Sequence, residues 1–207
     1  MTYTAWSVTF GEQPIGHAIG PALEAREALS TLMGNGPVDL VNKATSLAGL
    51  LFEMMGAKDG IHKAHEILKS GQAEKKLREI IDAQGGDPDI NPEDIILGKQ
   101  VTTVNATEKG RIQWINNRDI AQVARTAGAP KSKGAGVLLN KKLGDKVEKG
   151  ETLYTIYSES SQKLESAFVL TQSLNSIGIT EKFGEKMLVD RIPTKKEAHE
   201  KQFILER

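Results

Sequence analysis

One short stretch, residues 85–92, divides the chain into two parts whose apolar residues follow different periods. It reads Gly-Gly-Asp-Pro-Asp-Ile-Asn-Pro and gathers the residue types that interrupt helices and strands. Upstream of it, apolar residues recur at the three- and four-residue spacing of amphipathic helices, whereas downstream they alternate in short runs typical of strands. We therefore predict a mostly helical unit over residues 1–88, a linker over 89–99 and a second unit over 100–207.

The upstream unit is predicted to contain a short strand over residues 6–10 and then four helices. Pro21 suits a helix start because its missing N–H would have no partner there. The helices are predicted over residues 21–33, 37–55, 60–69 and 72–84. The second has a wide apolar face, and the last two place Ile61 and Ile80 on their buried sides.

The downstream unit mixes strands with helices in an order typical of an α+β fold. Strands are predicted over residues 100–106, 111–115, 137–139, 145–147, 153–157 and 186–191. Helices are predicted over residues 118–127 and 160–177, and Phe168 is expected on the inner face of the second. The whole chain is therefore expected to be α+β.

Composition excludes several classes of function. The chain has 27 basic and 27 acidic residues, so its net charge of zero lacks the basic footprint of non-specific nucleic-acid binding. It contains no cysteine, which excludes thiol chemistry and disulfides. The longest apolar region, residues 47–55, is interrupted by Glu53 and is far shorter than the roughly 20 residues of a membrane span. We expect a cytoplasmic protein with neither nucleic acid nor membrane as partner.

A glycine-rich turn precedes the first predicted helix. Residues 13–27, called here the signature segment, read Gln-Pro-Ile-Gly-His-Ala-Ile-Gly-Pro-Ala-Leu-Glu-Ala-Arg-Glu. A turn that enters a helix N-terminus offers N–H groups to an anion, and its carbonyls can hold a cation. The alternative is that Gly16 and Gly20 only permit a tight loop.

The signature segment resembles a pattern of the thymidine, pyrimidine nucleoside and archaeal AMP phosphorylases: Gln-Pro-Leu/Ile-Gly, a few residues, then Gly-Asn/Pro-Ala-Leu-Glu. Residues 110–118, 128–137 and 141–150 are similar to the C-terminal domain of the same family. The resemblance extends over about residues 6–191. Pro21, where the bacterial enzymes usually have asparagine, favours the AMP enzymes, and the pyrimidine enzymes remain the alternative.

The resemblance implies phosphorolysis, in which phosphate displaces a base from C1′ of a ribose. With AMP the products would be free base and ribose 1,5-bisphosphate. The family's Lys-His-Ser-type phosphate loop and Ser-Lys-Lys-type helix have no match here, and residues 131–133 and 141–142 only look alike. We therefore expect no catalytic residue in this chain and no activity from it alone. A non-catalytic assembly module is the alternative, and a homo-oligomer is expected.

The resemblance also implies a cation site, although no cofactor is expected to be required. Its ligands in this chain would be the carbonyls of Ile15 and Ala18 and the carboxylate of Glu27. Hard monovalent or divalent cations take oxygen ligands, and the remaining ones would come from the phosphate loop. The alternative for Glu27 is a solvated or salt-bridged helix carboxylate.

Two further patterns resemble known functional motifs only in part. Residues 136–156 resemble the half-motif of biotinyl and lipoyl carriers, which predicts a barrel-sandwich element, but residues 156–160 lack the lysine that a carrier would modify. His62 and His65, beside Glu66, have a spacing that could offer two metal ligands without a third, so a polar helix face is favoured.

Overall fold

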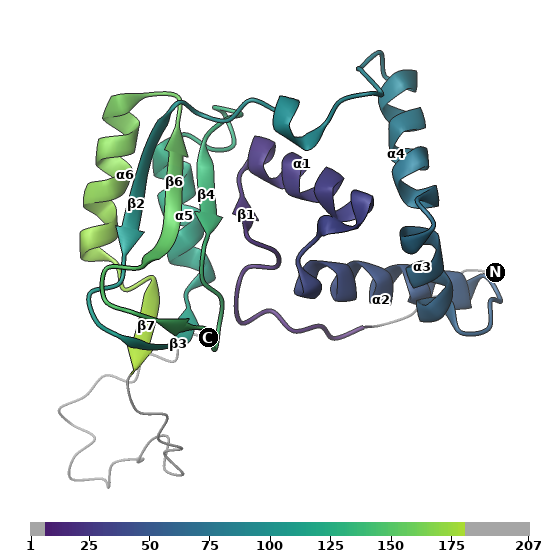
Figure 1. Cartoon of the computed structure of the whole chain (residues 1–207), viewed down its shortest axis with the longest axis horizontal. Helices are drawn as coiled ribbons and strands as arrows, with labels where there is room; N and C mark the ends of the chain where they lie inside the picture. The colour runs from purple at the N-terminus through teal and green to yellow at the C-terminus, as the bar shows by residue number, and fades with distance from the viewer. Residues whose placement is uncertain (1–6, 181–207) are drawn as a thin grey trace, which may run out of the picture.

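A computed structural model describes residues 7–180, with one side built mainly of helices and the other built of strands with two helices packed on them (Figure 1). The predictions for Trp6, for a strand over residues 186–191 and for the charged tail lie outside the described residues. No helix within residues 7–180 is long and apolar enough to cross a membrane.

The helical side matches the predicted helices closely. Its elements are α1 (Pro21–Ser30), a π-helical turn η1 (Thr31–Asn35), α2 (Val38–Met54), α3 (Gly60–Lys69), α4 (Gln72–Ala83) and a 3-10 turn η2 (Pro92–Asp94). Glycines with positive φ separate several of them, and Gly34 (φ 91°) lies within η1 where the chain turns toward α2. Asp59 caps α3 by accepting a hydrogen bond from the N–H of His62.

The strands form two antiparallel sheets. The first has the order β1 (Ala18–Ile19), β4 (Gly136–Leu139), β6 (Thr152–Ser158) and β2 (Gln100–Asn105), and the second has β5 (Lys146–Val147), β3 (Gly110–Ile115) and β7 (Ile177–Thr180). Helices α5 (Asn117–Ala127) and α6 (Ser161–Ser173) pack on the first sheet (Figure 1). The α+β class is therefore confirmed. Residues 7–180 form no closed barrel, and the barrel-sandwich element stays a prediction.

One hydrophobic core fills the space between these strands and helices. Its largest fully buried members are Tyr154, Ile112, Ile120, Leu139, Ile156, Val123 and Val137. They come from both sheets and from α5, and Ala167 of α6 completes the contact from the other helix. The alternating pattern that predicted β6 appears in its burial, because Tyr154, Ile156 and Ser158 are buried while the residues between them are only partly so.

Strand β1 comes from the helical half of the sequence and yet belongs to the first sheet. Ala18 pairs with Leu138 and Ile19 with Val137, so the signature segment forms one edge of that sheet. The predicted division at residues 89–99 stays a prediction.

The structure corrects two predicted elements and the predicted burial of one residue. Residues 7–10 form no strand. The helix predicted over residues 160–177 ends at Ser173, because Asn175 and Ser176 are poor helix formers and residues 177–180 pair with β3 instead. Phe168 is exposed, and Ala167 and Leu164 face the core in its place.

The helical side also buries less than its pattern predicted. Ile61 and Ile80, expected on buried sides, are exposed, and α4 has no buried residue. Leu51 on α2 is 61% exposed, and Met55, the residue after its end, is 86% exposed. The apolar faces exist, but several of their large side chains are exposed within residues 7–180.

Candidate functional site

The signature segment lies where the helical side meets the first sheet. It enters as a loop, forms β1 and continues through Gly20 into α1. Gly20 has φ 130° and ψ 149°, and a Cβ there would lie 2.4 Å from the carbonyl oxygen of Ala135. Only glycine allows α1 to begin so close to β4.

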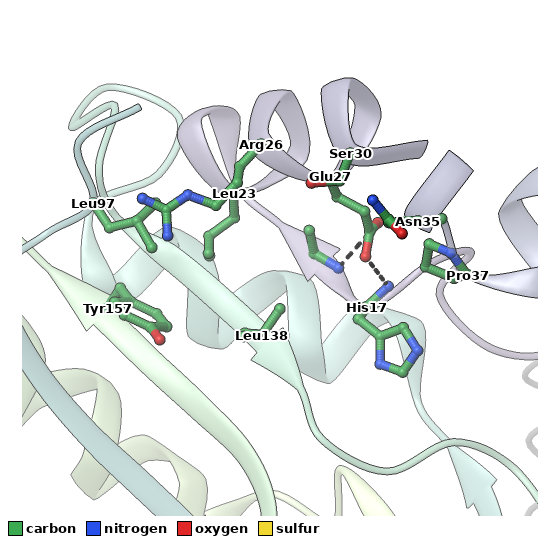
Figure 2. A pocket seen from close by; sticks show the side chains of 12 residues that line it. His17, Leu23, Arg26, Glu27, Ser30, Asn35, Pro37, Leu97, Leu138 and Tyr157 are labelled. Carbon is green, nitrogen blue, oxygen red and sulfur yellow. Dashed lines mark hydrogen bonds between the residues drawn. The ribbon is translucent and has the colours of Figure 1, made fainter. Parts of the chain in front are cut away.

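Glu27 reaches back from α1 to the loop that precedes it (Figure 2). Its Oε1 accepts a hydrogen bond from the N–H of His17 at 2.8 Å, and its Oε2 accepts one from the N–H of Ala18 at 3.4 Å. Gly16 has φ 68°, and a Cβ on it would lie 2.1 Å from Oε2 of Glu27. The carboxylate therefore fits closely against the loop because Gly16 has no side chain.

The carbonyls of the same peptides point the opposite way, as a trans peptide requires. The carbonyl of His17 accepts a hydrogen bond from the N–H of Leu139 at 2.8 Å, which continues the β1–β4 pairing. The carbonyl of Gly16 accepts a hydrogen bond from Nζ of Lys142 at 2.5 Å. Lys142 also donates to the carbonyl of Pro14. The loop thus has a carboxylate on its N–H side and an ammonium group on its carbonyl side.

Asp39, in the first turn of α2, is the third partner of Lys142. Its Oδ2 lies 3.0 Å from Nζ and also accepts a hydrogen bond from the N–H of Gly16 at 3.2 Å. Burial would raise the pKa of Asp39, but the hydrogen bond and charge of Lys142, together with the N–H groups of Leu40 and Gly16, hold it below the ordinary value.

Two more side chains of the signature segment bind the sheet side. The Gln13 side-chain oxygen accepts a hydrogen bond from the N–H of Leu143 at 2.9 Å. The His17 ring lies with Nδ1 2.8 Å from the carbonyl oxygen of Leu139. The segment is therefore joined to the C-terminal unit by its side chains as well as by its backbone.

A pocket of about 470 Å³ opens beside this loop (Figure 2). Its walls come from the signature segment, the turn before α2 and the first sheet. They include His17, Arg26, Glu27, Asn35, Leu138 and Tyr157. Arg26 points away from Glu27 and donates to the carbonyl of Ile95 at 2.6 Å, so it ties α1 to the segment before β2. The pocket is polar at the loop and apolar at Leu138.

The anion interpretation of the turn does not fit this geometry. The N–H groups that an anion would use already donate hydrogen bonds within the protein. The N–H of Gly16 donates to Asp39, and those of His17 and Ala18 donate to Glu27. The N–H of Gly20 donates to the Glu24 side chain, and that of Ala22 donates to the carbonyl of Lys133. A phosphate would have to displace these partners.

The cation interpretation requires the Glu27 carboxylate to lie beside the loop. Glu27 does face the loop that contains Ile15 and Ala18, and these three residues can supply three oxygen ligands. Within residues 7–180 no cluster of three or more His, Asp or Glu side chains could hold a metal ion. The predicted ligand set Ile15, Ala18 and Glu27 stays a prediction that needs further oxygen ligands.

Two of the lysines that resemble the family's catalytic motifs, Lys141 and Lys142, have structural partners. Lys142 donates to two carbonyls of the signature segment. Lys141 pairs with Glu151 and donates to the carbonyl of Lys146. His62 pairs with Glu66, whereas His65 lies 3.2 Å from the hydroxyl of Thr45, so the two rings face different partners. The roles of Gln13, His17, Lys142 and Asp39 were not foreseen, since only the fold brings them together.

Comparison with known proteins gives consistent matches. Residues 111–178 match the family described as the pyrimidine nucleoside phosphorylase C-terminal domain. A protein named AMP phosphorylase from Thermofilum pendens is 49% identical over 199 residues, covering 96% of this chain and 38% of that protein. The AMP phosphorylase of Pyrococcus horikoshii is 54% identical over 181 residues, covering 86% of this chain and 36% of that protein. The chain thus spans well under half the length of these relatives.

Proposed function

The chain corresponds to the C-terminal part of the pyrimidine nucleoside and AMP phosphorylase family. From this premise we propose that it forms part of a phosphorylase that acts on AMP or related nucleoside monophosphates. Phosphate would cleave the N-glycosidic bond and give free base and ribose 1,5-bisphosphate. The observation that carries the proposal is the folded signature segment, which connects the C-terminal unit to a pocket-lining loop, in a chain about half identical to proteins named AMP phosphorylase.

The chain's part in this reaction is to build one wall of the site. Phosphorolysis depends mainly on holding phosphate against C1′ and on stabilising charge as the bond breaks. The described residues offer a shaped loop, with its amides already partnered, and no free Lys and Ser/Thr cluster beside it. We therefore propose that the residues which bind phosphate and base come from the longer protein, and that this chain alone does not catalyse.

A chimaera tests the proposal. The part of the Pyrococcus horikoshii protein that this chain matches would be replaced by this chain, and phosphate-dependent release of base would be measured with AMP and with thymidine. Adenine release with formation of ribose 1,5-bisphosphate supports the AMP assignment. Release of thymine in place of adenine would support the pyrimidine alternative, and a folded chimaera inactive on both would contradict the proposal. The 207-residue chain alone, as the control, is expected to be inactive.

A cation at Ile15, Ala18 and Glu27 is a second part of the proposal, supported by the position of Glu27 against the loop. In the chimaera, potassium chloride should raise the thermal unfolding midpoint more than tetramethylammonium chloride does. The variant Glu27→Gln should lose that difference. Equal midpoints in the two salts with Glu27 intact would count against a cation at this position.

A non-catalytic assembly module remains the second candidate because of one observation, the exposed apolar face of α2. Contiguous exposed apolar surface marks contacts with other protein. In the first candidate this face packs on the longer protein, and in the second on another chain. Light scattering on the purified chain separates them: a stable oligomer together with an inactive chimaera favours the assembly module.

A further inference from the structure

The Lys142 ammonium group lies in a complete oxygen site. It is a compact positive charge with three donors, and all three have partners: the carbonyls of Pro14 and Gly16 and the carboxylate of Asp39. The side chain is only 13% exposed. Two carbonyls and one carboxylate are also the kind of ligands that a hard cation takes. The lysine therefore occupies a set of oxygens of the kind that binds a small monovalent cation, separate from the site proposed at Ile15, Ala18 and Glu27.

Lys142 and Glu27 act on the two ends of one peptide group. The carbonyl of the Gly16–His17 peptide accepts from Lys142, while its N–H donates to Glu27. Hydrogen bonds at both ends of a peptide polarise it and strengthen each other. Rotation of this peptide would break both charge-assisted bonds together, so each charged group stabilises the orientation that the other needs.

We propose that the Lys142 ammonium is a built-in cation that fixes the orientation of the Gly16–His17 peptide, making Lys142 a positioning residue for the loop that faces Glu27. Lys142 belongs to the turn after β4, so the C-terminal unit sets the shape of a loop in the helical half of the sequence. The inference goes beyond the proposed function and concerns the loop itself. It can therefore fail or hold independently of phosphorolysis.

The neighbouring residue provides a matched control. Lys141 is also a largely buried lysine with a carboxylate partner, Glu151, and a carbonyl partner, Lys146. None of its partners belongs to the signature segment. Replacing Lys141 removes a comparable charge one residue away without touching the loop.

The site is also open enough for a small replacement cation. A second pocket of about 450 Å³ adjoins it and is lined by Gln13, His17, Pro37, Val38, Asp39, Asn42, Lys142 and Asp145. If Lys142 is truncated to alanine, methylammonium can enter from this pocket and meet the same three oxygens. Tetramethylammonium has the same charge but no N–H donors, so it controls for ionic strength.

The test measures amide hydrogen exchange of His17 and Ala18 in the full 207-residue chain by NMR. In Lys142→Ala we expect both amides to exchange about tenfold faster or more, since a hydrogen bond to a charged group is lost from the peptide that carries the His17 N–H, and the Ala18 N–H belongs to the next peptide of the same loop. Methylammonium chloride should restore most of the protection, and tetramethylammonium chloride at equal concentration should not. Lys141→Ala should leave both amides unchanged.

Two results overturn the proposal. One is unchanged exchange at His17 and Ala18 in Lys142→Ala while the core amides of β6 remain protected. The other is faster exchange that the two salts affect equally. If Lys142→Ala unfolds, shown by loss of protection in β6, then Lys142→Met decides the question. This variant keeps the apolar stem, and the proposal fails if its His17 amide exchanges as slowly as in the parent.

Discussion

The strand-rich region over residues 100–180 and the helical region over residues 21–90 both have regular apolar patterns, of different periods, but they bury their apolar residues to different extents. In the first region the apolar residues form one core, with members such as Ile120, Val137 and Ile156 fully buried. In the second, the buried apolar residues are only Ala22, Leu23, Leu29 and Ala64. Amphipathic periodicity therefore predicted which residues lie on one face, but not whether that face has a partner within this chain.

The difference accords with a chain that matches a little over a third of its relatives' length. A helix that cannot bury its face locally draws little stability from tertiary packing, which is where most helical stability comes from. Under our proposal, the faces of α2 and α4 find their partners in the longer protein. The two regions should then respond differently to the same kind of mutation.

The largest contrast is expected from a pair of leucine truncations. Leu139→Ala removes a side chain that is 1% exposed and should lower the free energy of unfolding by about 3 kcal/mol. Leu51→Ala, on the exposed face of α2, should change it by less than about 0.5 kcal/mol. Urea unfolding measures both. Comparable losses would mean that α2 has a partner in the isolated chain, and the contrast between the regions would not hold.

The second contrast tests the contact between the regions. Gly20→Ala places a Cβ 2.4 Å from the Ala135 carbonyl, in a backbone conformation that essentially only glycine adopts. We expect a loss of about 2–3 kcal/mol, measured by urea unfolding. Gly56 also has a positive φ, but a Cβ there would meet nothing within 4 Å. Gly56→Ala should therefore lower the free energy of unfolding by only about 1 kcal/mol. Equal losses would show that α1 can move away from β4 without cost.

A smaller contrast is expected from two helix caps. Asn116 caps α5 and accepts hydrogen bonds from the N–H groups of Arg118 and Asp119. Asn116→Ala should lower the global free energy of unfolding by about 1 kcal/mol, because α5 belongs to the core. Asp59→Ala removes the cap of α3 and should instead raise hydrogen exchange locally in α3. A global loss from Asp59→Ala, seen as faster exchange in β6, would show that the two regions unfold as one unit.

The smallest effect is expected from acid. The pKa of Asp39 lies below its ordinary value, so its ionised form stabilises the fold above about pH 3.9. That contribution is lost as the pH falls through the lowered pKa. The amide shifts of Gly16 and Leu40 should therefore titrate with a midpoint below about 3.9, and Lys142→Ala should raise the midpoint. A midpoint unaffected by Lys142→Ala would remove the lysine as the cause.

The sequence predicted the regular elements well where the pattern is local. The bounds of α3 agree with the prediction, and those of α5 and β3 agree within one residue, because the apolar periodicity that predicted them is a local signal. It missed β1, whose two residues become a strand only through pairing with β4. It also extended the last helix into β7, where pairing with β3 outweighs the helical pattern.

The candidate site also depends on contacts between residues far apart in the sequence, which local patterns do not predict. The glycines pointed to the loop, and the resemblance to the phosphorylase family pointed to Glu27. Neither could show that Lys142, more than a hundred residues later, supplies the charge on the other side of the loop. The orientation of a peptide group depends on such distant partners, and one sequence does not contain that information.

The short strand β1 also has a consequence for the solution behaviour of the C-terminal unit. With only Ala18 and Ile19, it covers the backbone of β4, which would otherwise be an open edge of the first sheet. Unpaired edges are templates for strand addition between molecules, and proteins commonly cover them. The signature segment therefore also acts as protection against aggregation, and a truncated protein that begins after residue 98 would expose β4 to pairing with its own copies.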